Sequence, residues 1–180
     1  MAAVTLVGER APDFALRDLG GQLHPLGDTL GRITILVFWS ADCPHVARLD
    51  AYLLDVARDW TPEVISWRVA SMANESQSLL LQRSQALGVS LILLDPDQVV
   101  ADAYGAQVMP HVVVFDRGGV VRHCGAWDDV TFRQRLPARN YLAETVSSLL
   151  RGEVPAPRQE PAFGCALVRV WPAARSTNAG

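Results

Sequence analysis

Residues 33–39 (Ile-Thr-Ile-Leu-Val-Phe-Trp) form a nearly continuous run of β-branched, aliphatic and aromatic side chains. The run lacks the alternation of a half-exposed strand, so it predicts a central strand that is buried on both faces. Shortly afterwards Pro44 occupies a natural first position of a helix, and Val46, Leu49 and Leu53 continue a helical apolar stripe. A buried strand, a tight turn and an amphipathic helix indicate an α/β architecture.

The rest of the chain continues this alternation. The pair Gly20-Gly21 predicts a short N-terminal β-hairpin. We therefore expect an α/β/α sandwich with a mixed central sheet and an N-terminal hairpin extension. Strands are expected at 64–70, 89–94, 111–116 and 120–124, and helices at 76–87, 99–104 and 140–150.

A length of 180 residues suits one domain, which we expect to span residues 1–152. Residues 153–180 begin with three prolines in nine residues, which indicates an extended connector rather than a second domain. The following apolar segment is expected to dock on the same domain, and the last residues are expected to be disordered.

Composition excludes several classes of protein. The net charge of −3 gives no basic surface for nucleic acid or for an anionic membrane. The longest uninterrupted apolar run, 35–39, is far shorter than the roughly 20 residues of a membrane span. The first ten residues lack the pattern of a signal peptide, so we expect a cytoplasmic protein. All sixteen basic residues are arginine, which excludes lysine-based catalysis.

Cys43 lies between the buried strand and the proline-led helix. The N–H groups and the positive dipole at such a helix start stabilise a thiolate and lower a cysteine pKa from about 8.5 to roughly 3.5–7.5. Asp42 opposes this effect, whereas a protonated His45 supports it. We predict that Cys43 is a reactive nucleophile, with Pro44 starting its helix.

Two further cysteines, Cys124 and Cys165, could act on Cys43. Cys124 ends a predicted strand, so a buried, unreactive thiol is the favoured interpretation. Cys165 follows Gly164 and a connector long enough to cross the domain, and its function stays open between a resolving thiol and a structural residue. No histidine or cysteine spacing indicates a metal site, and no cofactor is expected.

Four ordered motifs carry a resemblance to a known family. They are Gly-x-x-Ala-Pro-Asp-Phe-x-Leu-x-Asp (8–18), Leu-Val-Phe-Trp-Ser-Ala-Asp-Cys-Pro (36–44), an aspartate followed after eight residues by Tyr-Gly (95–105), and Pro-x-Val-x-Val-Phe-Asp-x-x-Gly (110–119). They resemble thioredoxin-fold redoxins of the alkyl-hydroperoxide-reductase/thiol-specific-antioxidant (AhpC/TSA) type. Residues 125–165 further resemble a bacterial subgroup of thiol-disulfide isomerases and thioredoxin-family proteins.

This resemblance implies that Met109-Pro110 is a cis-proline loop that lies against Cys43 and presents main-chain groups to an extended substrate. Trp39, Ser40, Met109 and His111 are expected to flank the site, although core packing is the favoured role of Trp39.

The chain departs from the family pattern at Val46, where a Cys-x-x-Cys motif has its second thiol. Disulfide exchange within the motif is therefore excluded. Leu36 and Met109 replace a proline and an arginine of peroxiredoxins, which disfavours a standard peroxidase site.

We predict a thiol-based oxidoreductase that acts through Cys43 by thiol-disulfide exchange or peroxide reduction. Its expected partners are a thiol or disulfide protein, a small thiol or a peroxide; the oligomeric state is not indicated. The alternative is a non-catalytic thioredoxin-fold module that binds a protein or peptide, which Val46 favours.

Overall fold

Every side chain of the predicted central strand is buried in the computed structural model, which describes residues 6–170. The prediction for residues 33–39 is thus confirmed. In chain order the elements are β1 (Ala15–Asp18), β2 (Leu23–Pro25), the 3-10 helix η1 (Leu26–Thr29), β3 (Ile33–Trp39), α1 (Pro44–Trp60), β4 (Val64–Ala70), α2 (Gln77–Leu87), β5 (Ile92–Leu94), α3 (Val99–Ala103), β6 (Val108–Met109), β7 (His111–Phe115), β8 (Val121–Gly125), α4 (Tyr141–Leu150), β9 (Arg158–Glu160) and β10 (Cys165–Ala166).

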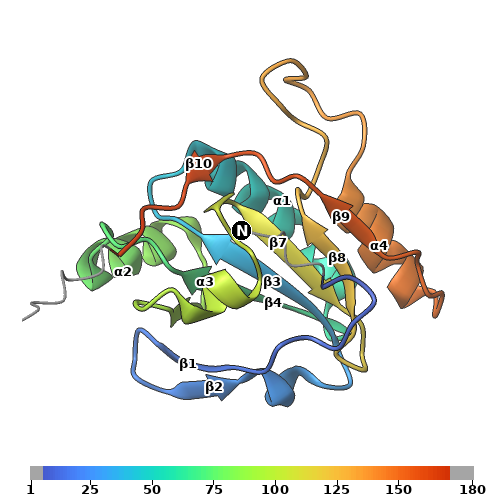
Figure 1. The fold of residues 1–180 in the computed structure, drawn as a ribbon, viewed down its shortest axis with the longest axis horizontal. Coiled ribbons are helices and arrows are strands. Elements are labelled where there is room, and N and C mark those ends of the chain that lie inside the picture. The colour runs from blue at the N-terminus through green and yellow to red at the C-terminus, as the bar shows by residue number, and fades with distance from the viewer. Residues whose placement is uncertain (1–5, 171–180) are drawn as a thin grey trace, which may run out of the picture.

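The main sheet has eight strands in the order β2-β1-β5-β4-β3-β7-β8-β9 (Figure 1). Strands β3, β4 and β5 are parallel, whereas β1 and β7 run antiparallel to their neighbours β5 and β3. The sheet is therefore mixed, and β1 with β2 forms the N-terminal hairpin that Gly20-Gly21 predicted. A second, two-stranded sheet pairs β6 with β10.

Alternation along β3 directs its side chains to two different helical layers. Phe38 contacts Tyr104 after α3, with ring centroids 6.1 Å apart. On the other face, Trp39 Nε1 donates a 2.6 Å hydrogen bond to Asp50 of α1. Helix α4 lies on the same face as α1, because Tyr141 at its start contacts His123 of β8. In Figure 1, α3 lies in front of the sheet and α1 behind it. This is the α/β/α sandwich that the sequence predicted.

Local signals account for several helix boundaries. The side chain of Ser76 accepts a hydrogen bond from the Leu79 N–H and caps α2, which ends at Gly88 with a φ of +68°. Asn140 caps α4 in the same way by accepting from Ala143. Among the described residues, no helix has the length and apolar character needed to cross a membrane.

The C-terminal segment contains strands that the sequence did not predict. Residues 153–170, called the strap below, were expected to be a connector and a docked segment, and within them β9 extends the main sheet by pairing in parallel with β8. In Figure 1 the strap is the red segment that crosses the upper part of the molecule to β10. The boundary expected after residue 152 stays a prediction, and the disorder expected at the chain end falls on residues 171–180, outside the described residues.

Candidate active site

Cys43 occupies the N-cap position of α1, and its carbonyl oxygen accepts hydrogen bonds from the N–H groups of Val46 and Ala47, both at 3.1 Å. The turn 40–42 between β3 and α1 is short, so the fully buried strand fixes where the helix begins. Cys43 is only 4% exposed. The sequence therefore predicted the local setting of this cysteine correctly: a strand end, a tight turn and a helix start with Pro44 at its first position.

A disulfide joins Cys43 to Cys165 across 122 residues of sequence, with the two Cα atoms 6.1 Å apart. Of the two possible partners that the sequence left open, the structure brings Cys165 to Cys43. Cys124 is a buried free thiol, in agreement with its favoured interpretation.

The strap reaches Cys43 by pairing with the proline loop. Cys165 of β10 is the antiparallel partner of Met109 in β6, and the N–H of Leu167 donates to the carbonyl of Gln107 at 2.8 Å. Gly164 is required here, because a Cβ on it would lie 1.9 Å from the Met109 carbonyl oxygen. Backbone pairing of the strap with residues 107–109 thus carries Cys165 to the start of α1.

The Met109–Pro110 peptide bond is cis, as the family resemblance implied. The carbonyl oxygen of Met109 lies 3.3 Å from the Sγ of Cys43. Because a disulfide sulfur has no hydrogen, this is a close contact and not a hydrogen bond. A second cis bond, Thr61–Pro62 after α1, was not predicted.

Ser40 contacts an acidic side chain, Glu75, that the sequence does not point to. Its hydroxyl donates to Glu75 Oε1 at 2.6 Å, and the Ala41 N–H donates to the same oxygen at 2.9 Å. Glu75 Oε2 is buried and has no partner among residues 6–170. Glu75 and both disulfide cysteines line one cavity of about 160 Å³. No sequence signal links Glu75 to Cys43, since the two are joined only through the fold.

Trp39 flanks Cys43 in sequence but not at the surface. Its side chain is fully buried, and its hydrogen bond to Asp50 belongs to a buried network in which Arg68 forms an ion pair with the same carboxylate at 3.0 Å. Trp39 therefore packs in the core and links β3 to α1 through its hydrogen bond to Asp50. His45 does lie at the site, with its ring 5.0 Å from the ring of Phe163 in the strap.

His111 follows Pro110 directly and faces Cys124, with Nε2 3.3 Å from Sγ. Burial lowers the pKa of His111 to about 4 and raises the pKa of the Cys124 thiol to about 11. Both groups are consequently neutral near pH 7, and this pair is not an activated nucleophile. Within the described residues, no group of three His, Cys, Asp or Glu is arranged to hold a metal ion.

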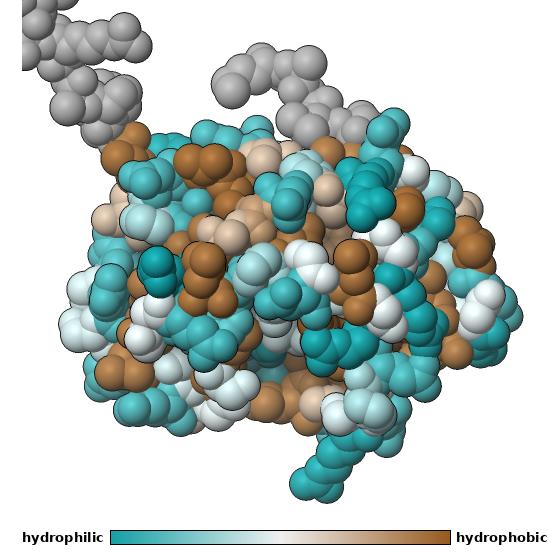
Figure 2. Space-filling model, turned by 90° about the horizontal axis from the view of Figure 1, so that it is seen from below, coloured by the Kyte–Doolittle hydropathy of each residue, from teal (hydrophilic) through white to brown (hydrophobic). Residues whose placement is uncertain are grey.

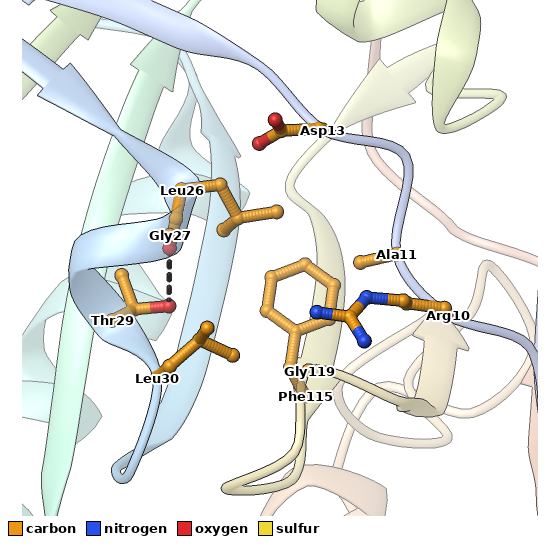
Figure 3. A pocket seen from close by; sticks show the side chains of 9 residues that line it. All are labelled: Arg10, Ala11, Asp13, Leu26, Gly27, Thr29, Leu30, Phe115 and Gly119. Atoms are coloured by element: carbon orange, nitrogen blue, oxygen red, sulfur yellow. Dashed lines mark hydrogen bonds between the residues drawn. The ribbon is translucent and has the colours of Figure 1, made fainter.

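Another pocket lies far from the disulfide, where β7 ends at Phe115 (Figure 3). Arg10 and Asp13 border it on one side, and Leu26 and Leu30 on the other. Since β7 begins next to Pro110, its full length separates this pocket from the cysteines. The neighbouring end of the molecule, seen from below in Figure 2, mixes hydrophobic and hydrophilic residues. The cysteine chemistry is therefore at the opposite end of the sheet.

Residues 7–124 match the AhpC/TSA family, which is more than half of the chain. The chain belongs to this family. The match includes Cys43 and Pro110 and ends before the strap, so Cys165 lies outside the part that defines the family.

Individual proteins extend this result. The thiol:disulfide interchange protein DsbE of Allochromatium vinosum is 28% identical over 120 residues, which cover 66% of this chain and 65% of that protein, slightly less than two thirds of its length. An uncharacterized conserved protein from Geobacillus kaustophilus has a TM-score of 0.82 at 27% identity, with 97% of this chain and 99% of that chain covered.

A third comparison concerns the fold alone. The thioredoxin domain of a thiol-disulfide oxidoreductase from Bacteroides vulgatus aligns with a TM-score of 0.59 at 21% identity, over 66% of this chain and 86% of that chain. The fold of this chain is the thioredoxin fold, as the resemblance implied.

Proposed function

We propose that this chain is a thiol-disulfide oxidoreductase whose redox pair is Cys43 and Cys165. The observation that carries the proposal is their disulfide, in which a helix-start cysteine is joined to a cysteine that the strap delivers. Val46 cannot supply a second thiol, and Cys165 fills that role from outside the motif. The name of the relative from Allochromatium vinosum, thiol:disulfide interchange protein, supports the same chemistry.

The exchange reaction starts from the reduced pair. The Cys43 thiolate attacks one sulfur of a substrate disulfide, which forms a mixed disulfide and expels the first substrate thiolate. The Cys165 thiolate then attacks Cys43 Sγ and expels the second substrate thiolate. Two electrons pass to the substrate, and the protein is left with the Cys43–Cys165 disulfide. The α1 N-terminus assists the first step, since it stabilises Cys43 as the attacking thiolate.

The strap must move during this cycle. In the disulfide form Cys165 pairs with the main chain of Met109, which is the group that the resemblance assigns to an extended substrate. Substrate and strap therefore compete for the same backbone groups. Glu75, with its unpartnered buried oxygen in the cavity beside both cysteines, is positioned to accept a proton released there.

Trapping of the mixed disulfide tests the proposal. The reduced Cys165→Ser variant treated with bis(2-hydroxyethyl) disulfide is expected to accumulate one mercaptoethanol adduct on Cys43, visible by intact-mass and peptide mass spectrometry. Wild type and the matched control Cys124→Ser should resolve the adduct to the internal disulfide, and Cys43→Ser should lose turnover. Unimpaired turnover in Cys43→Ser or Cys165→Ser would reject this redox pair.

Peroxide reduction is the second chemistry open to Cys43. A peroxide would convert the thiolate to a sulfenic acid and release an alcohol or water, and Cys165 would condense with it and release water. We favour disulfide exchange, because the later strand has Met109 where peroxiredoxins carry an arginine. If turnover with hydrogen peroxide exceeded turnover with a disulfide substrate, peroxide reduction would be favoured over disulfide exchange. The cytoplasmic location stays a prediction.

A further inference from the structure

The loop between β8 and α4 carries the two most exposed large hydrophobic side chains of the described residues. Phe132 is 85% exposed and Leu136 is 82% exposed. In Figure 1 this loop is the orange segment that projects from the top of the molecule, on the side where the strap crosses. Neighbouring exposed apolar side chains on a projecting loop are typical of a protein-binding surface.

The first residues of the loop are fixed to α1. Trp127 stacks on Tyr52 with ring centroids 5.4 Å apart, and the guanidinium of Arg48 lies 4.3 Å from the centre of the Trp127 ring. The same guanidinium forms an ion pair with Asp128, a buried carboxylate, through two nitrogens. An anchored loop loses little conformational entropy when a partner binds it.

A second set of hydrogen bonds closes the loop. The side chain of Asp129 accepts from the N–H groups of Ala138 and Arg139, at 2.9 and 3.1 Å, and from the side-chain amide of Gln134 at 2.6 Å. These bonds join the start of the loop to its end, and Phe132 and Leu136 lie between them. Their exposure therefore belongs to a defined loop conformation.

The loop and the strap line one pocket beside the start of α1. Phe132 packs edge-on against Phe163 of the strap, with ring centroids 4.7 Å apart, and Phe163 in turn contacts His45. Together with Pro44 and Arg135 these residues enclose about 330 Å³ beside the start of α1. Phe163 lies two residues before Cys165, so the Cys43–Cys165 disulfide holds one wall of the pocket in place.

The charge around this pocket is positive. Arg48 and Arg139 are neutralised by Asp128 and Glu144. Arg133 and Arg135, in contrast, form no ion pair with any residue between 6 and 170, and Arg135 lines the pocket itself. An acidic partner would complement this edge.

We propose that residues 130–136 together with Phe163, here called the docking surface, bind a protein reductant whose thiol is flanked by apolar and acidic side chains. The proposal rests on the proposed function, because it names the partner that returns the Cys43–Cys165 disulfide to the dithiol. A protein is favoured over a small thiol, since Leu136 lies outside the pocket and a ligand that only filled the pocket would leave it exposed.

The electron transfer is a second thiol-disulfide exchange. A thiolate of the reductant attacks one sulfur of the Cys43–Cys165 disulfide, forms a mixed disulfide and releases the other cysteine as a thiolate. The second thiol of the reductant then displaces the remaining cysteine, so the reductant leaves as a disulfide and this chain as a dithiol. Once the strap is released, Phe163 no longer completes the docking surface, and the reduced product dissociates.

Two matched model peptides test the proposal on the full-length oxidised protein. The acidic probe is acetyl-Leu-Glu-Cys-Asp-Phe-amide, and the basic probe replaces both acidic residues with lysine. Rates of disulfide loss are measured by acid quenching, alkylation and mass spectrometry, at equal thiolate concentration. Each rate is divided by the rate with dithiothreitol. Wild type should favour the acidic probe by about two- to fivefold at low salt, which is the effect of one exposed charge pair.

Substitutions in the docking surface should change this preference in separate ways. Arg135→Glu should reverse it in favour of the basic probe, and Phe132→Ser should slow both probes about threefold by removing apolar contact. The matched controls are Arg32→Glu, an exposed arginine just before β3, and Leu23→Ser, an exposed leucine in the edge strand β2. Both should behave as wild type. Raising the salt from about 0.01 to about 0.5 M should remove the charge preference.

Three results would overturn the proposal. Equal normalised rates for both probes in wild type would reject the charge complementarity, and an unchanged preference in Arg135→Glu would place it elsewhere. A third result would assign the pocket to a small acidic thiol. In that case 3-mercaptopropionate would be preferred over 2-mercaptoethylamine, the preference would depend on Arg135, and Leu136→Ser would not change the rates with the peptides. Failure of the proposed function is separate, because it would appear as turnover that survives Cys43→Ser.

Discussion

Gly164 passes so close to Met109 that a Cβ would meet the Met109 carbonyl oxygen at 1.9 Å and its carbonyl carbon at 2.7 Å. Both neighbours are main-chain atoms of the cis-proline loop, which cannot turn aside as a flexible side chain can. This backbone contact fixes the position from which the next residue, Cys165, reaches Cys43. The disulfide therefore depends on a glycine that is not itself part of it.

Gly164→Ala should weaken the Cys43–Cys165 disulfide, because the strap must shift away from Met109. An overpacking cost of about 1–3 kcal/mol would lower the equilibrium constant for forming the disulfide about fivefold or more. Titration against defined ratios of reduced and oxidised glutathione measures this constant. Gly27→Ala is the matched control, since a Cβ there meets no atom within 4 Å. Equal constants for wild type and Gly164→Ala would show that the strap adapts without cost.

Cys43 in the reduced protein should titrate below a free thiol. The open N–H groups of α1 stabilise its thiolate, and the neighbouring Met109 carbonyl, which favours the neutral thiol, is expected to be the weaker influence. Iodoacetamide alkylation rates of Cys43, followed by peptide mapping from pH 4 to 10, should give a midpoint below about 8. A midpoint at about 8.5 or higher would show that α1 does not activate this cysteine.

Cys124 should remain unmodified under the same conditions. Burial raises the pKa of its thiol to about 11, so only about one molecule in a thousand carries the thiolate at pH 8. At that pH, iodoacetamide should label Cys43 and Cys165 of the reduced, folded protein and spare Cys124, while labelling in urea should reach all three. Rapid labelling of Cys124 in the folded protein would contradict its burial.

Val46→Cys should give the helix a second thiol of its own. Positions three apart on a helix are neighbours on one face, and this is the spacing of the Cys-x-x-Cys motif, whose two thiols form a disulfide. In a Cys165→Ser background this substitution should restore turnover with bis(2-hydroxyethyl) disulfide, and it would then show that the strap cysteine serves as the missing member of the motif. Val46→Ala in the same background is the control for the loss of a buried valine side chain. A variant that folds but forms no internal disulfide would reject the interpretation.

The sequence predicts the parts of this molecule that depend on local patterns. Residues close together in the sequence predict the strand β3, the start of α1 at Pro44 and the caps of α2. The family motifs add the cis bond before Pro110. These features place Cys43 at a helix start without any knowledge of long-range contacts.

Other features depend on contacts that the sequence does not encode locally. Glu75 reaches Ser40 only because β4 lies beside β3, and a lone glutamate in a loop has no periodic signal. Strands β6, β9 and β10 have two or three residues each and exist through their pairing partners. The choice between Cys165 and Cys124 likewise depended on the path of the strap.

The last prediction concerns stability against pH and depends on His123, which is fully buried. Its Nε2 lies 2.7 Å from the carbonyl oxygen of Ala126 and donates to it, whereas Nδ1 is buried without a partner among the described residues. Protonation would place a second N–H group where nothing accepts it. This burial lowers the pKa of His123 to about 4, from an ordinary value of 6.5.

A lowered histidine pKa means that the unfolded chain binds a proton more readily than the folded protein. Above pH 6.5 both states are neutral at His123, and its stability contribution is fully present. Between pH 6.5 and about 4 only the unfolded state takes up the proton, so the contribution of His123 to the free energy of unfolding falls by about 1 kcal/mol per pH unit as the pH falls. His111, whose pKa burial also lowers to about 4, adds a contribution of the same sign. Urea unfolding of the oxidised protein at pH 7, 6 and 5 measures this slope. His123→Gln keeps a donor for Ala126 but does not titrate, so it should lower the slope of the free energy of unfolding by about 1 kcal/mol per pH unit. An unchanged slope would show that His123 does not contribute to it.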